Sequence, residues 1–244
     1  MFAAGAAALL LIGRSLVHWG LKRALRAPRL RETQELTAHG LAGEAVAIPT
    51  MRGRRLFGWW LPATGATPAR PSVVVILHGW GGNAEVMLPL APALQTAGHA
   101  VLLIDARNHG RSDDDDFSSL PRFAEDLDAA LAWLRARADV DHARIAVIGH
   151  SVGAGATLLA VARGAPIAAV VSLAAFTHPA EIMRRWLAAK HVPYWPFGWY
   201  VLRHIQRVIG HRFDAIAPIN TIARVQCPIL LMHGCEDATV PADD

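Results

Sequence analysis

The sequence predicts an α/β fold in which a mostly parallel sheet is covered by helices on both faces. Three observations predict it. Several short runs consist almost wholly of Val, Ile, Leu and Ala, which is typical of strands that are buried on both faces. Segments with helical periodicity or small residues separate these runs. Strands that alternate with helices along a chain indicate parallel βαβ units.

The expected strands and helices follow in order along the chain. Two strands joined by a turn open the domain at 44–50 and 54–61, and they add an antiparallel edge to the sheet. Helices are expected at 84–97, 120–138 and 154–162; the second has apolar residues at helical spacing. The buried strands are expected at 72–77, 100–104, 144–148, 168–173 and 228–232.

Residues 176–219 do not fit this alternation. They lie between the last two expected strands and are rich in aromatic residues, namely Trp186, Tyr194, Trp195, Phe197, Trp199 and Tyr200. Such a dense aromatic group is seldom left in water. We expect a helical lid whose aromatic side chains line an apolar pocket; the alternative is an ordinary but longer crossover.

The composition excludes several classes of protein. The 244 residues carry a net charge of +4, and the basic residues crowd the N-terminus. They form no basic stripe interleaved with aromatic residues, so nucleic-acid binding is not expected. Cys227 and Cys235 flank one expected strand without the spacing of a metal site. They are expected to be reduced thiols, with neither a disulfide nor a metal site.

Residues 1–31 are a candidate membrane anchor ahead of a domain at 35–244. An apolar run covers 2–12, and it reaches residue 21 only if Arg14 and His18 are tolerated; a membrane span needs about 20 apolar residues. We expect an uncleaved transmembrane helix, or a helix lying on the membrane surface. The basic flank would keep the domain on the cytoplasmic side. The alternative is a helix packed on the domain of a soluble cytoplasmic protein.

Residues 149–153 read G-x-S-x-G and stand between an apolar strand and a small-residue helix. This context is typical of a nucleophile elbow, a tight turn that exposes the serine hydroxyl above the sheet. Glycines on either side of the serine let the strand and the helix approach closely. The pattern therefore predicts that Ser151 is a nucleophile.

Three more motifs follow other expected strands. They are HGWGGN at 78–83, DARNHGRS at 105–112 and HGCED at 233–237, the last followed by Val240 and Pro241. Together with the elbow, and in this order, they resemble the α/β-hydrolase superfamily over about residues 44–244. Within it, the chain is similar to serine aminopeptidases, monoglyceride lipases and prolyl-oligopeptidase-like enzymes.

The resemblance implies a role for each motif. Ser151 would be the nucleophile and Asp237 the triad acid, with Glu236 ranked second. The backbone amides of Trp80 and Val152 would form the oxyanion hole. No cofactor or metal is implied. The implied reaction is hydrolysis of a carboxylic ester, or less readily an amide, of a small apolar acyl substrate through an acyl-enzyme.

Residues 105–112 and their neighbours are expected to order a loop near the site rather than to act in the triad. Asp105, Arg107 and His109 match a segment of the family. The acidic run at 113–116 is expected to be a solvated loop, since its spacing lacks a calcium-binding pattern.

The chain departs from the family in one respect. In this fold the base follows the acid in the chain, and no histidine after Asp237 matches it. We expect a fragment that lacks the family's last strand and helix and is impaired in catalysis. The alternatives are a catalytically inactive, membrane-associated binding domain and an acyltransferase that uses the same residues. The sequence does not indicate an oligomeric state.

Overall fold

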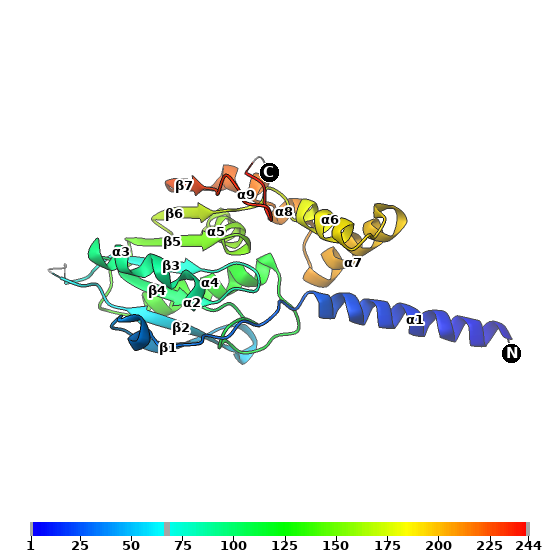
Figure 1. Ribbon diagram of the computed structural model, residues 1–244, viewed down its shortest axis with the longest axis horizontal. Helices are drawn as coiled ribbons and strands as arrows, with labels where there is room; N and C mark the ends of the chain where they lie inside the picture. The colour runs from blue at the N-terminus through cyan, green and yellow to red at the C-terminus, as the bar shows by residue number, and fades with distance from the viewer. Residues whose placement is uncertain (1, 66–68, 243–244) are drawn as a thin grey trace.

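A seven-stranded sheet forms the centre of the computed structural model, which describes residues 2–65 and 69–242, with side chains in the first helix from Ile12 onward. The strand order is β1-β2-β4-β3-β5-β6-β7 (Figure 1). Strands β3 to β7 pair in parallel, whereas β2 is antiparallel to both β1 and β4. The bounds are β1 Glu44–Pro49, β2 Arg55–Leu61, β3 Val73–Leu77, β4 Ala100–Ile104, β5 Ile145–His150, β6 Ala169–Leu173 and β7 Ile229–Met232. The expected mostly parallel sheet with an antiparallel edge is confirmed.

Helices cover both faces of the sheet. On one face, α4 (Leu120–Arg135) and α5 (Val152–Ala162) pack on alternate side chains of the central strands. On the other face, α2 (Ala84–Met87) and α3 (Ala91–Thr96) pack on the intervening side chains of the same strands. Each central strand is therefore buried on both sides, which explains its unbroken apolar sequence. Short turns of 3₁₀-helix lie at Leu36–His39, Met51–Gly53, Leu88–Leu90 and Ile222–Arg224.

The single helix expected at 84–97 is divided in the structure. The 3₁₀ turn Leu88–Leu90 separates α2 from α3. Pro89 and Pro92 stand at the first turns of the second and third pieces. Proline has no N–H for a helical hydrogen bond and clashes with the preceding turn. The helix therefore breaks where the sequence pattern alone suggested continuity.

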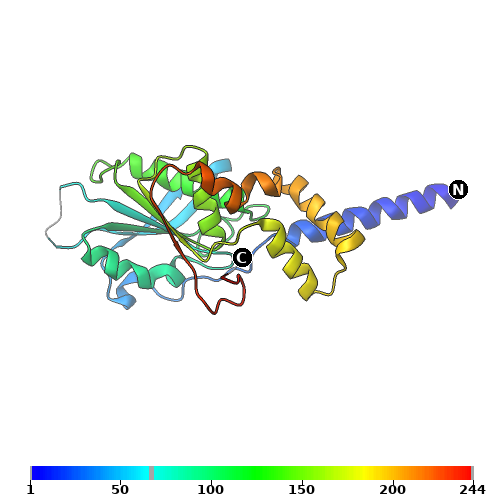
Figure 2. The same cartoon turned by 90° about the horizontal axis from the view of Figure 1, so that it is seen from above.

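A helical segment extends from one end of the sheet between β6 and β7. It contains α6 (Pro179–Ala189), α7 (Trp199–Ile209), α8 (Phe213–Ile216) and α9 (Pro218–Thr221), with a π-helical turn at Tyr194–Gly198. We call residues 176–219 the lid segment; α6 and α7 project beyond the sheet (Figures 1 and 2). Most of its aromatic side chains are exposed at the tip, Trp195 by 70%.

The N-terminal helix α1 (Phe2–Ala24) points away from the sheet, and its C-terminal end lies against the domain (Figure 2). Within the part of the chain that the structure describes, no helix is long and apolar enough to cross a membrane. The expected transmembrane anchor is therefore wrong. Arg14 and His18 divide the apolar sequence, and the unbroken run 2–12 is shorter than the about 20 residues that a span needs.

Strand β7 lies at an edge of the described sheet. Its side chains Leu230, Leu231 and Met232 are exposed by 54%, 60% and 51%. An apolar edge strand is a template for pairing with another strand. Among the described residues, the strand expected to be buried at 228–232 is therefore an exposed edge strand instead.

Candidate active site

The nucleophile elbow has the strained geometry that its sequence predicts. Ser151 has φ 52° and ψ −115°, a conformation that costs a non-glycine residue free energy and persists only when its surroundings impose it. A Cβ on Gly149 would lie 2.5 Å from the Gly153 carbonyl oxygen, and one on Gly153 would lie 2.5 Å from the His78 carbonyl oxygen. The Ser151 N–H donates to the Leu173 carbonyl at 2.8 Å. Both glycines are required for this close approach.

All four site residues expected from the sequence line one cavity. The cavity has a volume of about 800 Å³ and is bordered by Ser151, Val152, Trp80 and Asp237. Each of these residues follows the carboxyl end of a parallel strand, the end at which sites form in open α/β sheets. The rest of the wall is mainly apolar and includes Met87, Leu120, Phe176, Ile182, Met183, Val201, Ile205 and Ile209. Of the aromatic residues in the lid segment that were expected to line a pocket, Trp186 does so and the others named above do not.

The loop after β3 passes directly beside the nucleophile. A Cβ on Gly79 would lie 3.1 Å from Ser151 Cβ and 2.8 Å from His150 Nδ1. Only glycine fits here, and the next residue is Trp80. Val152 begins α5, and the first N–H groups of a helix have no partner within it and carry its positive dipole end. Two backbone segments suited to holding an oxyanion therefore meet at Ser151.

Asp237 has the properties of a charged acid at the cavity wall. Its Oδ1 accepts hydrogen bonds from the Val240 N–H at 3.0 Å and the Thr239 N–H at 2.8 Å. These bonds hold the pKa of Asp237 below its usual range. Glu236 is exposed and does not line the cavity. Of the two candidate acids, the geometry therefore favours Asp237 as the acid of the site.

Two of the described histidines border the cavity, His78 and His150. His78 Nδ1 donates to the Gly79 carbonyl at 2.6 Å, and its Nε2 accepts from the Ala106 N–H at 3.0 Å. Burial lowers the pKa of His78 to about 3, so it is neutral. Burial also lowers the pKa of His150, which directly precedes the nucleophile. Neither follows the acid in the chain, where this fold places its base.

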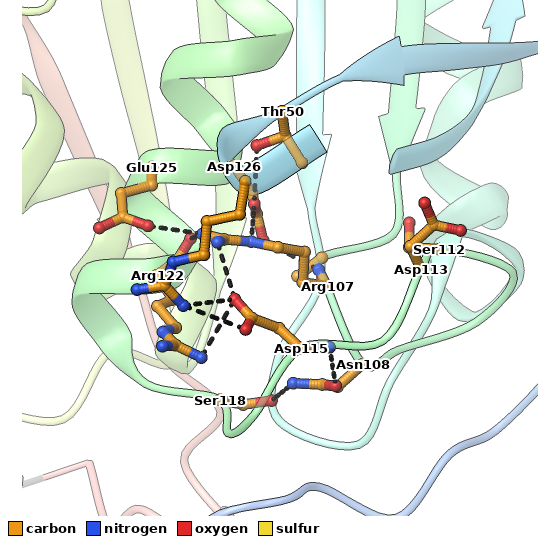
Figure 3. A network of polar contacts seen from close by, with 12 residues as sticks. Thr50, Arg107, Asn108, Ser112, Asp113, Asp115, Ser118, Arg122, Glu125 and Asp126 are labelled. Carbon is orange, nitrogen blue, oxygen red and sulfur yellow. Dashed lines mark hydrogen bonds and ion pairs between the residues drawn. The ribbon is translucent and has the colours of Figure 1, made fainter. Parts of the chain in front are cut away.

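The loop after β4 is held by a buried network centred on Arg107 (Figure 3). Its guanidinium donates to Asp126 Oδ1 at 2.6 Å, to Asp115 Oδ2 at 3.0 Å and to Glu125 Oε2 at 2.6 Å. Arg122 adds an ion pair to Asp115 at 3.1 Å. The expectation that Arg107 orders this loop agrees with these contacts.

The network corrects the expectation of a solvated loop at 113–116 for Asp115, whereas Asp114 and Asp116 are exposed. Asp115 is only 6% exposed and pairs with three arginines, Arg52, Arg107 and Arg122. Three separated basic residues compensate the desolvation of this carboxylate. The loop continues into Ser118 and Ser119, which line the cavity. The buried network therefore positions part of the cavity wall.

Asp105 forms a second buried acidic contact. Its carboxylate accepts from the Ala84 N–H and the Arg111 N–H, both at 2.7 Å. Burial, and then the contact and charge of Glu32, raise the pKa of Asp105 well above its usual range. Both Glu32 oxygens are buried, and no donor among the described residues bonds to them. The raised pKa therefore favours the protonated form of the buried Asp105 carboxyl beside Glu32.

Replacing Glu32 by glutamine is expected to raise stability at high pH. The neutral amide removes the charge that opposes ionisation of Asp105, so ionising Asp105 costs less free energy. In the wild type, the folded state binds a proton that the unfolded state releases, so stability falls as pH rises above the ordinary aspartate pKa. We expect a gain of about 1 kcal/mol in the free energy of unfolding at pH 8 and a smaller gain at pH 5, measured by urea denaturation. Equal gains at both pH values, or none, would contradict the role of Glu32 in raising the pKa of Asp105.

The chain belongs to the α/β-hydrolase fold family, whose family model matches residues 72–215. A sequence relative, an uncharacterized protein of Mycobacterium tuberculosis, is 37% identical over 204 residues, covering 82% of this chain. The chain spans 64% of that relative's length.

Solved structures show the same fold. An esterase from Pyrococcus furiosus superposes with a TM-score of 0.71 and 22% identity, over 89% of this chain and 79% of that one. An acetyl xylan esterase from a Paenibacillus species superposes with a TM-score of 0.66 and 21% identity, over 92% of this chain and 80% of that one.

Proposed function

We propose that the protein is a serine hydrolase that cleaves a carboxylic ester of an apolar acyl group, with an amide as the less favoured substrate. One observation carries the proposal: a largely apolar cavity of about 800 Å³ unites the strained Ser151 with Trp80, Val152 and Asp237. The names of two structural neighbours, both esterases, add support.

The proposed reaction has two steps. Ser151 Oγ attacks the ester carbonyl carbon while a base takes its proton, and the backbone amides of Trp80 and Val152 hold the oxyanion. The intermediate then collapses, the C–O bond to the alcohol breaks, and the alcohol leaves with the proton. Water attacks the acyl-serine in the second step and releases the carboxylic acid. Asp237 orients the base and stabilises its charged form.

The cavity wall supports an apolar acyl group. Its described charged or titratable members are Asp237, His78 and His150, and these stand at the end near the nucleophile. Apolar side chains of α1, α2, α4, α6, α7 and α8 and of the loops after the strands make most of the rest. Burying an apolar chain there is favourable by about 25 cal/mol per Å² of surface removed from water.

The proposed reaction also needs a general base. Since neither His78 nor His150 matches the base of this fold, we propose that the 244-residue chain is impaired and that an added base restores part of its activity. Imidazole is small enough to enter the cavity and carries the same functional group as a histidine.

The test is hydrolysis of p-nitrophenyl butyrate by the purified chain, with and without imidazole. We expect slow turnover that imidazole raises at least about tenfold beyond its effect on the uncatalysed reaction. A general base typically contributes at least that much to the rate. Hydrolysis of the matching p-nitroanilide should be slower. A folded protein that gives no turnover in either condition would contradict hydrolysis and favour a catalytically inactive binding domain. Appearance of a new ester when an alcohol is added would indicate acyl transfer.

A further inference from the structure

The N-terminal helix supplies part of the cavity wall. Leu21 and Ala24 of α1 border the same cavity as Ser151, and so do Leu25 and Leu30 beyond the end of the helix. Figures 1 and 2 show the C-terminal end of α1 beside α7, while its other end projects into solvent. The apolar residues at the C-terminal end of α1 therefore lie at the cavity, whereas the described side chains of the helix before Leu21 do not border it.

The C-terminal end of α1 is fastened to the loop that the Arg107 network orders. Lys22 Nζ pairs with Asp116 Oδ2 at 3.0 Å, and Arg26 Nε donates to the Asp116 carbonyl at 3.1 Å. The Ser118 N–H donates to the Leu25 carbonyl at 2.9 Å. These bonds orient the side chains of Lys22 and Arg26 toward the loop, whereas Leu21 and Leu25 border the cavity.

The same helix is fastened to the lid segment on its other side. His18 Nε2 lies 2.6 Å from the Tyr200 hydroxyl of α7, and the His18 ring stacks on the His204 ring with centroids 3.9 Å apart. One turn further along, Leu21 faces the cavity together with Val201 and Ile205 of α7. Thus α1 joins the lid segment to the β4 loop across one side of the cavity.

We propose that α1 is a wall of the substrate cavity and that Leu21 and Leu25 limit the length of the acyl chain it accepts. This inference rests on the proposed function, which identifies the ligand as an ester. The ligand class is a neutral ester whose acyl chain extends from Ser151 toward the seam of α1 and α7. A short acyl chain stays near the nucleophile, whereas a long one reaches the α1 leucines.

The test measures binding rather than catalysis, in the full chain carrying Ser151→Ala. Methyl hexanoate and methyl palmitate displace N-phenyl-1-naphthylamine, a neutral apolar fluorophore. Adding Leu21→Trp fills the cavity beside α1, so that a long acyl chain there would clash with the indole ring. We expect affinity for methyl palmitate to fall about tenfold or more, while that for methyl hexanoate changes less than about twofold.

The matched control is Leu16→Trp, which places the same residue on α1 at a side chain that is 63% exposed and does not line the cavity. It should change neither affinity. Thermal unfolding checks each variant, and Leu25→Phe replaces Leu21→Trp if the latter fails to fold. An equal loss for both esters, no loss, or the same loss with Leu16→Trp would overturn the proposal.

The outcome is separable from the proposed function. If the chain-length pattern is found but the wild type hydrolyses no ester, the cavity wall stands and the hydrolase fails. If the wild type hydrolyses esters and the pattern is missing, the hydrolase stands and the role of α1 fails.

Discussion

Replacing Ser151 by alanine is expected to reduce labelling by a fluorophosphonate probe to below about 1% of the wild-type level. The probe reacts with an activated serine hydroxyl, and the elbow places that of Ser151 at the cavity wall beside Trp80 and Val152. The folded state should persist, because alanine at this position removes one oxygen. The measurement is in-gel fluorescence at matched protein concentration, with imidazole present to supply a base.

Ser118→Ala is the control for this experiment. Ser118 borders the same cavity, and its hydroxyl accepts a hydrogen bond from Asn108 Nδ2 at 3.1 Å. If exposure to the cavity were sufficient for reaction, Ser118 would also be labelled. We expect the Ser118→Ala variant to label like the wild type. Equal labelling of Ser151→Ala and the wild type would contradict the assignment of the nucleophile.

Replacing Arg107 by methionine is expected to lower the free energy of unfolding by about 3–5 kcal/mol. The side chain of Arg107 is 1% exposed, as is that of Asp126, and that of Asp115 is 4% exposed. Removing one partner of a buried ion pair leaves the other charge desolvated without compensation. Urea denaturation followed by tryptophan fluorescence measures the change. A loss below about 1 kcal/mol would show that the network does not hold the loop.

Arg163→Met provides the matched comparison. Arg163 pairs with Asp128 at 3.2 Å, but the two side chains are 38% and 47% exposed. Exposed pairs are worth about 0–1 kcal/mol, so this variant should differ little from the wild type.

The loss caused by Arg107→Met is also expected to depend on pH. Burial raises the pKa of Asp126 to about 6, although the charge of Arg107 opposes the rise. Without that charge the pKa rises further, so the folded variant binds protons that the unfolded chain releases. Its stability then falls as pH rises. The loss should be smaller at pH 5 than at pH 8; the reverse order would contradict this account.

The sequence predicted most of the sheet and the edge at which the candidate site residues meet. The strand Ala100–Ile104 agrees with its expected bounds, because an unbroken apolar run ends at polar residues on both sides. The elbow, the loop after β3 and the loop before Val240 each follow a parallel strand. Since such strands end at one edge of the sheet, Ser151, Trp80 and Asp237 could be expected together.

Other features depend on contacts between distant residues. The acidic run at 113–116 gave no local sign that Asp115 would be buried, because its partner Arg52 lies 63 positions away in the sequence and Arg122 reaches it only in the folded loop. Helical periodicity likewise groups residues on one face but does not say which face meets a cavity. In the structure, the aliphatic face of α7 lines the cavity, whereas Trp199 of the same helix is 42% exposed. The contact between His18 and Tyr200 joins residues 182 positions apart.

The most direct test of the proposed nucleophile is mass-spectrometric mapping of the protein after incubation with p-nitrophenyl butyrate. Rapid acid quenching preserves an acyl-enzyme, and peptide fragmentation then identifies the modified residue. The proposed mechanism predicts a butyryl group on the hydroxyl of Ser151 and its absence from the Ser151→Ala variant. A butyryl group found in the folded wild-type protein on another residue, with Ser151 unmodified, would contradict it.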